Sequence, residues 1–252
     1  MGARYLALTE TLSAELAGLP PNTVLPTEEQ LARRYGVSRV TVRQALGVLE
    51  RAGLLSRQRG RGTIVSPPKV VRSLAPVTTM EEDLARQGVK LETRILEFER
   101  RHPAPATVRA KVGGRRPSRV GFLTLLRLVD DRVIAYDRSY FPTDLAARFD
   151  PESFDGPMLE AVRELAGSPV TWVDWEIEIL PAPREAASAL GITPRLPVVV
   201  STSTLWREDD TLIIRTERFY RIDRVKFRHS TRYPSSPAPI DAARPTGAAV
   251  NR

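Results

Sequence analysis

The sequence predicts an α+β protein with an N-terminal helical domain and a C-terminal domain built on an antiparallel sheet. Apolar residues recur at helical spacing between Arg4 and Ala52, whereas residues 80–235 hold a series of β-like runs. Pro67-Pro68 separates the two regions. With 252 residues, 42% of them hydrophobic, the chain is long enough to bury one large core or two modest ones.

Three helices are expected in the N-terminal region. Apolar spacing predicts the first over residues 4–19, before the breaker Pro20-Pro21. Thr27 is a good N-cap for a second helix that runs through Arg34 and stops at Gly36. Ser38 is the expected N-cap of a third helix that continues to about Ala52, with Gly53 as its terminator.

The second and third helices have helix-turn-helix spacing. Ala32 supplies a small residue where the helices touch, Gly36 permits a positive φ in the turn, and Val42 is a β-branched residue in the second helix. One arc of the third helix is expected to pack inward: Val42, Ala45, Leu46, Leu49 and Ala52. The motif is typical of DNA-binding domains.

The outward arc of the third helix carries features that suit a DNA groove. It holds Arg39, Val40, Arg43, Gln44, Gly47 and Arg51. An apolar Val40 on this face could meet a thymine methyl group, and Gly47 would allow close approach to a phosphate backbone. The alternative is an ordinary solvated face.

A hairpin wing is predicted after Gly53. LLSRQ and TIVS alternate like two strands around Arg59-Gly60-Arg61-Gly62. Arginines on a narrow glycine tip suit the minor groove, where the electrostatic potential is negative. Between Glu28 and Gly62 there are eight arginines and three acids. This local excess of positive charge is a stronger indication of an anionic partner than the net charge of +8 for the whole chain.

The run LPTEEQLARRYGVSRVTVRQALGVLERAGLLSRQRGRGTIV resembles the winged helix-turn-helix domain of the GntR family of bacterial transcription regulators. The match is long and free of gaps. The resemblance implies DNA contacts from the start of the third helix, the wing tip and the start of the second helix. The predicted DNA-binding residues are Thr27, Glu28, Ser38, Arg39, Val40, Thr41, Arg43, Gln44, Arg59, Gly60, Arg61 and Gly62.

The C-terminal region shows a weak internal repeat. Six β-like runs are interleaved with helical stretches such as 157–166 and 184–190. Asp130-Asp131 and Asp209-Asp210 each join two strands, and the second strands end in Tyr140-Phe141 and Phe219-Tyr220. This offset repeat predicts a pseudo-twofold domain in which a pocket between the halves is possible.

This region is similar to the UTRA effector-binding domain of HutC-type GntR regulators, whose fold is like that of chorismate lyase. The similarity is carried by VTTMEEDLARQG, LLRLVDDRVIAYDRSYFP and TLIIRTERFYRIDRVKFRH. It implies effector contacts from Thr78, Thr79, Arg127, Asp137, Ser139, Tyr220 and Arg221. Leu125 stands where many members have an arginine, which indicates an effector less anionic or more apolar than a sugar phosphate.

The effector candidates also have structural explanations. Arg127 and Asp137 would form a surface ion pair, Arg221 would pair with Asp223 at a strand end, and Thr78 and Thr79 would cap a helix starting at Met80. The three tryptophans are more typical of a core or an interface than of a stacking platform.

The sequence predicts four segments along the chain. They are a winged helix-turn-helix domain at 1–67, a linker at 68–76, an effector domain at 77–234 and a disordered tail at 235–252.

The composition excludes most metal-binding and nucleophile chemistry. The chain has no cysteine and two isolated histidines, His102 and His229, so we predict no catalytic residue, no metal ligand and no cofactor beyond a small-molecule effector. No apolar run approaches the ~20 residues of a membrane helix, and the N-terminus is unlike a signal peptide. We therefore expect a cytoplasmic protein with no membrane partner.

Our first hypothesis is an effector-responsive transcription regulator, most simply a repressor, that binds a palindromic double-stranded DNA operator as a homodimer. Two-fold symmetry would place two recognition helices about one helical turn apart. One alternative is an enzyme built on the chorismate lyase-like domain, which would need convergent acid-base or oxyanion groups. The other is a ligand-free architectural DNA binder, which would need a C-terminal domain without an internal pocket.

Overall fold

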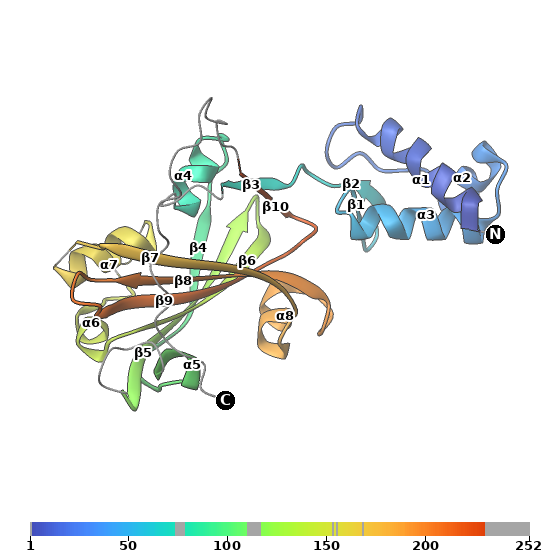
Figure 1. Cartoon of the computed structure of the whole chain (residues 1–252). Coiled ribbons are helices and arrows are strands. Elements are labelled where there is room, and N and C mark those ends of the chain that lie inside the picture. The colour runs from blue at the N-terminus through green and yellow to red at the C-terminus, as the bar shows by residue number, and fades with distance from the viewer. Residues whose placement is uncertain are drawn as a thin grey trace, which may run out of the picture.

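Two structural regions are visible in the computed structural model. It describes residues 2–73, 79–109, 117–152, 154, 156–167 and 169–229. We call residues 2–65 the head and the described residues from 70 to 229 the sheet domain. The head lies to one side of the sheet domain, and the chain crosses between them just after the head's hairpin (Figure 1). No helix among the described residues is long and apolar enough to cross a membrane.

Local capping fixes the elements of the head. They are α1 (Gly2–Leu16), α2 (Glu28–Tyr35), α3 (Arg39–Arg51), β1 (Leu55–Gln58) and β2 (Gly62–Val65). Thr27 forms a reciprocal capping box with Gln30, and the Ser38 hydroxyl accepts the backbone N–H of Thr41. Gly36 ends α2 at φ 62°, a left-handed conformation that glycine adopts without strain. The predicted caps are thereby confirmed.

The core of the head forms where α1 crosses α3. Leu8, Leu12 and Leu16 of α1 are buried together with the inward residues of α3 and with Leu31 of α2. Two expectations were wrong. Ala52 is exposed because α3 has already ended at Arg51, and α1 ends at Leu16 rather than Leu19, whose side chain is 42% exposed.

The sheet domain contains a six-stranded antiparallel sheet in the order β4-β5-β6-β9-β8-β7. Its strands are β4 (Glu92–Pro103), β5 (Arg119–Val129), β6 (Arg132–Phe141), β7 (Trp172–Pro181), β8 (Pro197–Trp206) and β9 (Leu212–Tyr220). Its helices are α4 (Met80–Ala85), α5 (Ala106–Arg109), α6 (Thr143–Arg148), α7 (Met158–Ala166) and α8 (Arg184–Leu190). The six predicted strands and the two predicted helices are confirmed.

The sheet order confirms the internal repeat. The halves β4-α5-β5-β6 and β7-α8-β8-β9 meet at the central pair β6·β9, so each strand has a counterpart at the same distance from the centre. An ion pair joins Arg138 to its repeat partner Glu217, 79 residues further on, with Nη2 2.8 Å from Oε2.

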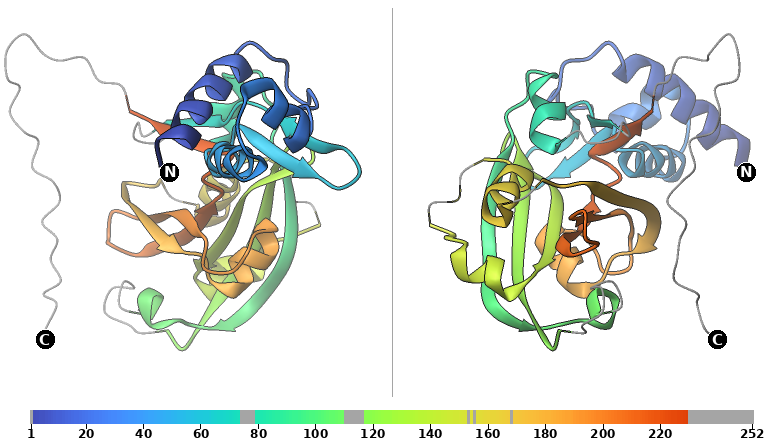
Figure 2. Two further views of the ribbon diagram at one scale, coloured as in Figure 1. Left: turned by 90° about the vertical axis from the view of Figure 1, so that its right-hand side faces the viewer. Right: turned by 60° about the vertical axis from the view of Figure 1, so that its left-hand side comes forward.

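Helices cover both faces of the curved sheet (Figure 2). Leu125 packs with α6 and α7, whereas its neighbour Leu126 packs with α8, because successive strand residues point to opposite faces. Ala135 and Tyr220 pack beneath α4, and α5 packs on Phe122 and Tyr140. The residues Asp137 and Ser139 therefore lie on the face that α4, α6 and α7 cover.

The stretch expected to be a linker contains a strand. β3 (Val70–Ser73) lies within residues 68–76 and pairs in parallel with β10 (Val225–Arg228). The connector is therefore part of the sheet domain from Val70 onward, and the crossing to the head is restricted to residues 66–69. The predicted disordered tail, 235–252, lies outside the described residues, as does Thr78.

Candidate DNA interface and effector site

The outer face of α3 presents the side chains predicted to read DNA. Arg39, Arg43 and Gln44 are exposed, and Val40 is 62% exposed although it is apolar. This exposure is unexplained by packing, since the same helix buries Val42, Ala45, Leu46 and Leu49 in the core of the head. An exposed valine between arginines suits contact with a base edge that carries a methyl group.

Glu28 at the start of α2 orients Arg43. The Nε and Nη2 atoms of Arg43 donate to Glu28 Oε2 at 3.2 and 3.0 Å. The hydrogen bond from Arg43 is the main reason that the pKa of Glu28 lies below its ordinary value. Ser38 and Thr41, whose hydroxyl oxygens lie 2.9 Å apart, occupy the first turn of α3 beside this pair. The structure thus brings together predicted residues from both helices of the motif.

The wing tip is a short glycine turn. Gly60 and Gly62 have φ angles of 81° and 89°, which residues with side chains rarely adopt. Arg59 and Arg61 are both exposed, and Arg61 donates through Nη1 to Gln58 Oε1 at 3.3 Å. Both arginines are therefore available to an external anion.

A buried ionic network crosses the centre of the sheet face beneath α4. Asp137 of β6 accepts Arg127 Nε at 2.9 Å and Arg218 Nε and Nη2 at 2.6 and 2.8 Å. Arg127 and Asp137 are each 1% exposed, so the alternative of a surface pair is wrong. Ser139 lies next along the same face and shares a 2.9 Å hydrogen bond with Thr216 of β9.

The charges of this network are balanced. Burial alone would raise the pKa of the Asp137 carboxyl, but the charges of Arg218 and then Arg127 outweigh burial and hold that pKa below its ordinary value. Arg127 also donates through Nη1 to Glu81 Oε1 at 2.9 Å and to Thr93 Oγ1 at 2.7 Å. Two arginines thus face two carboxylates.

A second ionic group ties α4 to β3. Arg72 of β3 forms a short ion pair with Asp83 of α4 and donates through Nη1 to the Thr79 carbonyl at 3.0 Å. The Nε of Arg72 donates to the Tyr220 hydroxyl at 3.4 Å. Thr79 itself forms a capping box with Glu82, so it does cap the helix that starts at Met80.

The structure gathers most of the predicted effector residues but not all of them. Arg127, Asp137, Ser139 and Tyr220 lie on one sheet face, and Thr79 caps α4, which covers that face. Arg221 does not join them; it pairs with Asp223 at 2.6 Å, as its structural explanation expected, and donates to the Leu190 carbonyl.

Sequence reasoning missed Arg218, Glu81 and Arg72. Arg218 precedes Tyr220 by two positions, so strand alternation places both on one face, but its contact with Asp137 depends on the β6·β9 register. Glu81 reaches the network from α4, and Arg72 reaches the second ionic group from β3; no local pattern signals those contacts.

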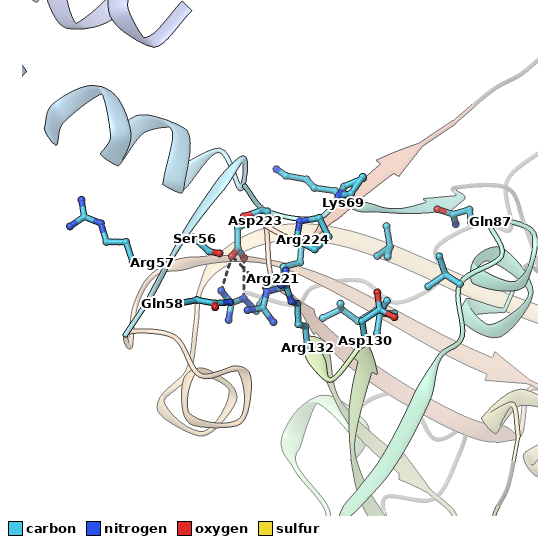
Figure 3. Close-up of a pocket in the computed structure, with 17 residues that line it drawn as sticks. Ser56, Arg57, Gln58, Lys69, Gln87, Asp130, Arg132, Arg221, Asp223 and Arg224 are labelled. Atoms are coloured by element: carbon cyan, nitrogen blue, oxygen red, sulfur yellow. Dashed lines mark hydrogen bonds and ion pairs between the residues drawn. The ribbon is translucent and has the colours of Figure 1, made fainter. Parts of the chain in front are cut away.

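A cavity lies where the head meets the sheet domain. Its volume is about 540 Å³, and residues of β1, the crossing 66–69 and the turn after β9 line it (Figure 3). Arg221 and Asp223 lie in its wall, and so do Arg132 and Arg224. Within the described ranges, no three His, Asp or Glu side chains gather to hold a metal ion.

Comparison with known families gives two matches along the chain. Residues 5–65 match the bacterial regulatory proteins of the gntR family, and residues 86–226 match the UTRA domain. The two matched segments correspond to the head and to most of the sheet domain.

Two relatives named as transcriptional repressors align over most of the chain. The HTH-type transcriptional repressor NagR of Bacillus subtilis (strain 168) is 31% identical over 227 residues, which cover 89% of this chain and 93% of NagR. A probable fructoselysine utilization operon transcriptional repressor of Escherichia coli (strain K12) is 27% identical over 202 residues, 80% of this chain and 82% of that protein. These relatives are transcription regulators, not enzymes.

Solved structures share the fold. The crystal structure of PhnF from Mycobacterium smegmatis superimposes with a TM-score of 0.59 at 24% identity and covers 90% of this chain and 99% of its own. The chain belongs to the GntR family of bacterial transcription regulators, in the HutC-type group that carries a UTRA domain.

Proposed function

We propose that the chain is a cytoplasmic repressor that binds a palindromic operator as a homodimer and is modulated by a small molecule bound on the sheet face beneath α4. The observation that supports the DNA-binding half is the exposed outward set on α3, in which Glu28 holds Arg43 by hydrogen bonds. Arg43 and Val40 contact base edges in the major groove, and Arg59 and Arg61 enter the adjacent minor groove.

The edge strand β7 is the proposed dimer contact. Among the described residues it pairs with β8 alone, and Ile177 and Ile179, which share a face, are 40% and 72% exposed. The opposite edge, β4, is interrupted by two register shifts and rich in charged residues, which protect an edge from pairing. β7 pairs with β8 without interruption, so it offers a second copy a regular template.

Light scattering on the purified chain tests the dimer. Ile179→Lys should convert the dimer to a monomer and weaken operator binding, because it places a charge on the apolar face of β7. Leu96→Lys is the matched control: Leu96 is 51% exposed on the β4 edge, so this variant should stay dimeric. A monomeric wild-type chain, or dissociation by the control alone, contradicts the proposal.

Effector binding is proposed to act through Glu81. The cations of the sheet face are already balanced, so an incoming carboxylate or phosphoryl group has to displace Glu81 from Arg127. A polar uncharged ligand would instead hydrogen-bond to Ser139 and Thr216. Either ligand shifts α4, which Arg72 and Asp83 connect to β3 and so to the crossing into the head.

A coupling of ~1–3 kcal/mol between the two sites would change operator occupancy several-fold. A thermal-shift screen of metabolites with the full chain tests this proposal. A true effector raises the melting temperature of the wild type and changes operator affinity, and Glu81→Gln should bind an anionic effector more tightly. A chain that no metabolite stabilises would favour the ligand-free architectural binder.

A further inference from the structure

The cavity between the head and the sheet domain is not used by either proposed site. Both regions supply its wall: β1 and the crossing 66–69 on one side, and the turns after β5 and β9 on the other (Figure 3). Any molecule that fills it therefore touches both regions.

The lining of this cavity has an excess of positive charge. Five of its side chains are cations and two are anions. One of the anions, Asp223, is already engaged by Arg221, with Nη2 to Oδ2 at 2.6 Å and Nε to Oδ1 at 3.0 Å. Arg224 reaches the same carboxylate only at 3.9 Å. The sheet face, by contrast, contains as many carboxylates as arginines.

Arg57 pairs with Glu50 at 3.2 Å, whereas the other three cations of the lining donate to neutral oxygens. Three such hydrogen bonds are present: Lys69 Nζ to the Ile222 carbonyl at 2.8 Å, Arg132 Nη2 to Asn22 Oδ1 at 2.9 Å, and Arg224 Nη1 to the Val133 carbonyl at 2.8 Å. In the part of the chain that the structure describes, no carboxylate lies within ion-pair distance of Lys69 or Arg132. Each of these side chains keeps further N–H donors.

The surroundings of Arg224 disfavour its positive charge. Burial and then the neighbouring charge of Arg221 lower the pKa of Arg224 to about 10, and Arg132 contributes in the same direction. An anion between these guanidinium groups would remove the repulsion, because it supplies the charge and the acceptors that the wall lacks.

We propose that this cavity binds a small multivalent oxyanion, either inorganic phosphate or the phosphoryl group of an organic phosphate, held by Lys69, Arg132 and Arg224. Lys69 lies in the crossing, and Arg132 already donates to Asn22 of the head. The bound anion therefore fixes the head against the sheet domain. Through this contact the anion affects operator binding independently of an effector bound on the sheet face.

Calorimetric titration of the full chain with sodium phosphate tests the site, with sodium chloride at matched ionic strength as the reference. Arg132→Gln/Arg224→Gln should bind phosphate about tenfold more weakly or worse, since it removes two charge-assisted contacts. The matched control, Arg86→Gln/Arg148→Gln, removes two exposed arginines of the sheet domain outside the cavity and should bind like the wild type. Equal affinity in all three proteins, or no binding to the wild type, overturns the proposal.

Hydrogen exchange on the unmodified chain gives an independent test should the double variant misfold. Phosphate should slow exchange in residues 56–58, 66–70 and 221–224, and protection confined to the sheet face would overturn the site.

Titration with glucose 6-phosphate in place of phosphate distinguishes an organic phosphate from inorganic phosphate as the natural ligand. Tighter binding of the ester assigns the site to an organic phosphate, and weaker binding assigns it to inorganic phosphate.

Discussion

Two arginine–carboxylate pairs show how differently the head and the sheet domain use the same chemistry. Arg43 and Glu28 form a pair on the outside of the head, where the Arg43 side chain is 59% exposed. Arg127 and Asp137 form a pair in the sheet domain at 1% exposure. An exposed pair contributes little to stability and leaves its arginine available to DNA, whereas breaking a buried pair leaves an uncompensated charge. The first pair is thus suited to recognition and the second to holding the fold around a site.

The largest effect is expected from Asp137→Ala. It leaves Arg127 and Arg218 buried without their shared carboxylate, and we expect the sheet domain to lose about 3–5 kcal/mol of unfolding free energy. All three tryptophans lie in β7 and β8, so urea unfolding followed by tryptophan fluorescence reports on this domain. A loss below about 1 kcal/mol would show that the network does not stabilise the sheet.

Arg43→Ala is the corresponding change in the head. Operator affinity should fall roughly tenfold to a hundredfold if Arg43 contacts a base edge, with little change in stability. A gel shift at fixed salt measures it, because phosphate contacts make affinity depend on ionic strength. Arg33→Ala, which removes an exposed arginine of α2 paired with Glu29, is the control and should bind the operator nearly as the wild type does. Equal affinities of the Arg43 variant and the wild type would exclude the base contact.

The stability that Asp137 contributes to the sheet domain should depend on pH in the acid range. The pKa of Asp137 is lowered in the folded protein, so its contribution to stability is present above its unfolded pKa of about 4 and is lost as pH falls through the folded pKa. Urea unfolding between about pH 5 and pH 2 should show a steep loss of sheet-domain stability. Asp137→Asn should make that dependence shallower, and an unchanged slope would assign the acid sensitivity to other carboxyls such as Asp223.

The smallest effect is expected at Gly47 in the interior of α3. An added Cβ would meet only Arg51 Nη1, at 3.5 Å, so Gly47→Ala fits the fold and should stabilise the head by about 0.5–1 kcal/mol. If the glycine lets the helix approach a phosphate backbone, the same variant should bind the operator more weakly. Circular dichroism melting and a gel shift measure the two effects. A stabilised variant with undiminished affinity would remove the reason for a glycine at this position.

The head was predictable from sequence because its signals are local. The caps at Thr27 and Ser38, the turn at Gly36 and the exposure of Val40 each depend on residues within a few positions of one another. The strands of the sheet domain were predictable for the same reason. The partnership of Asp137 with Arg218 was not, since it depends on the register of strands 81 residues apart. The cavity between the head and the sheet domain could not be predicted either, because its walls come from two regions that share no sequence pattern.

Selection of duplexes from a random DNA pool would show which DNA sequence the chain binds. The full chain should enrich a palindrome with two half-sites about one helical turn apart, and Arg43→Ala should lose or relax the preference at one position in each half-site. Enrichment of no motif by the wild type, or the same palindrome at the same affinity for the variant, would contradict the account of α3 as the element that reads the operator.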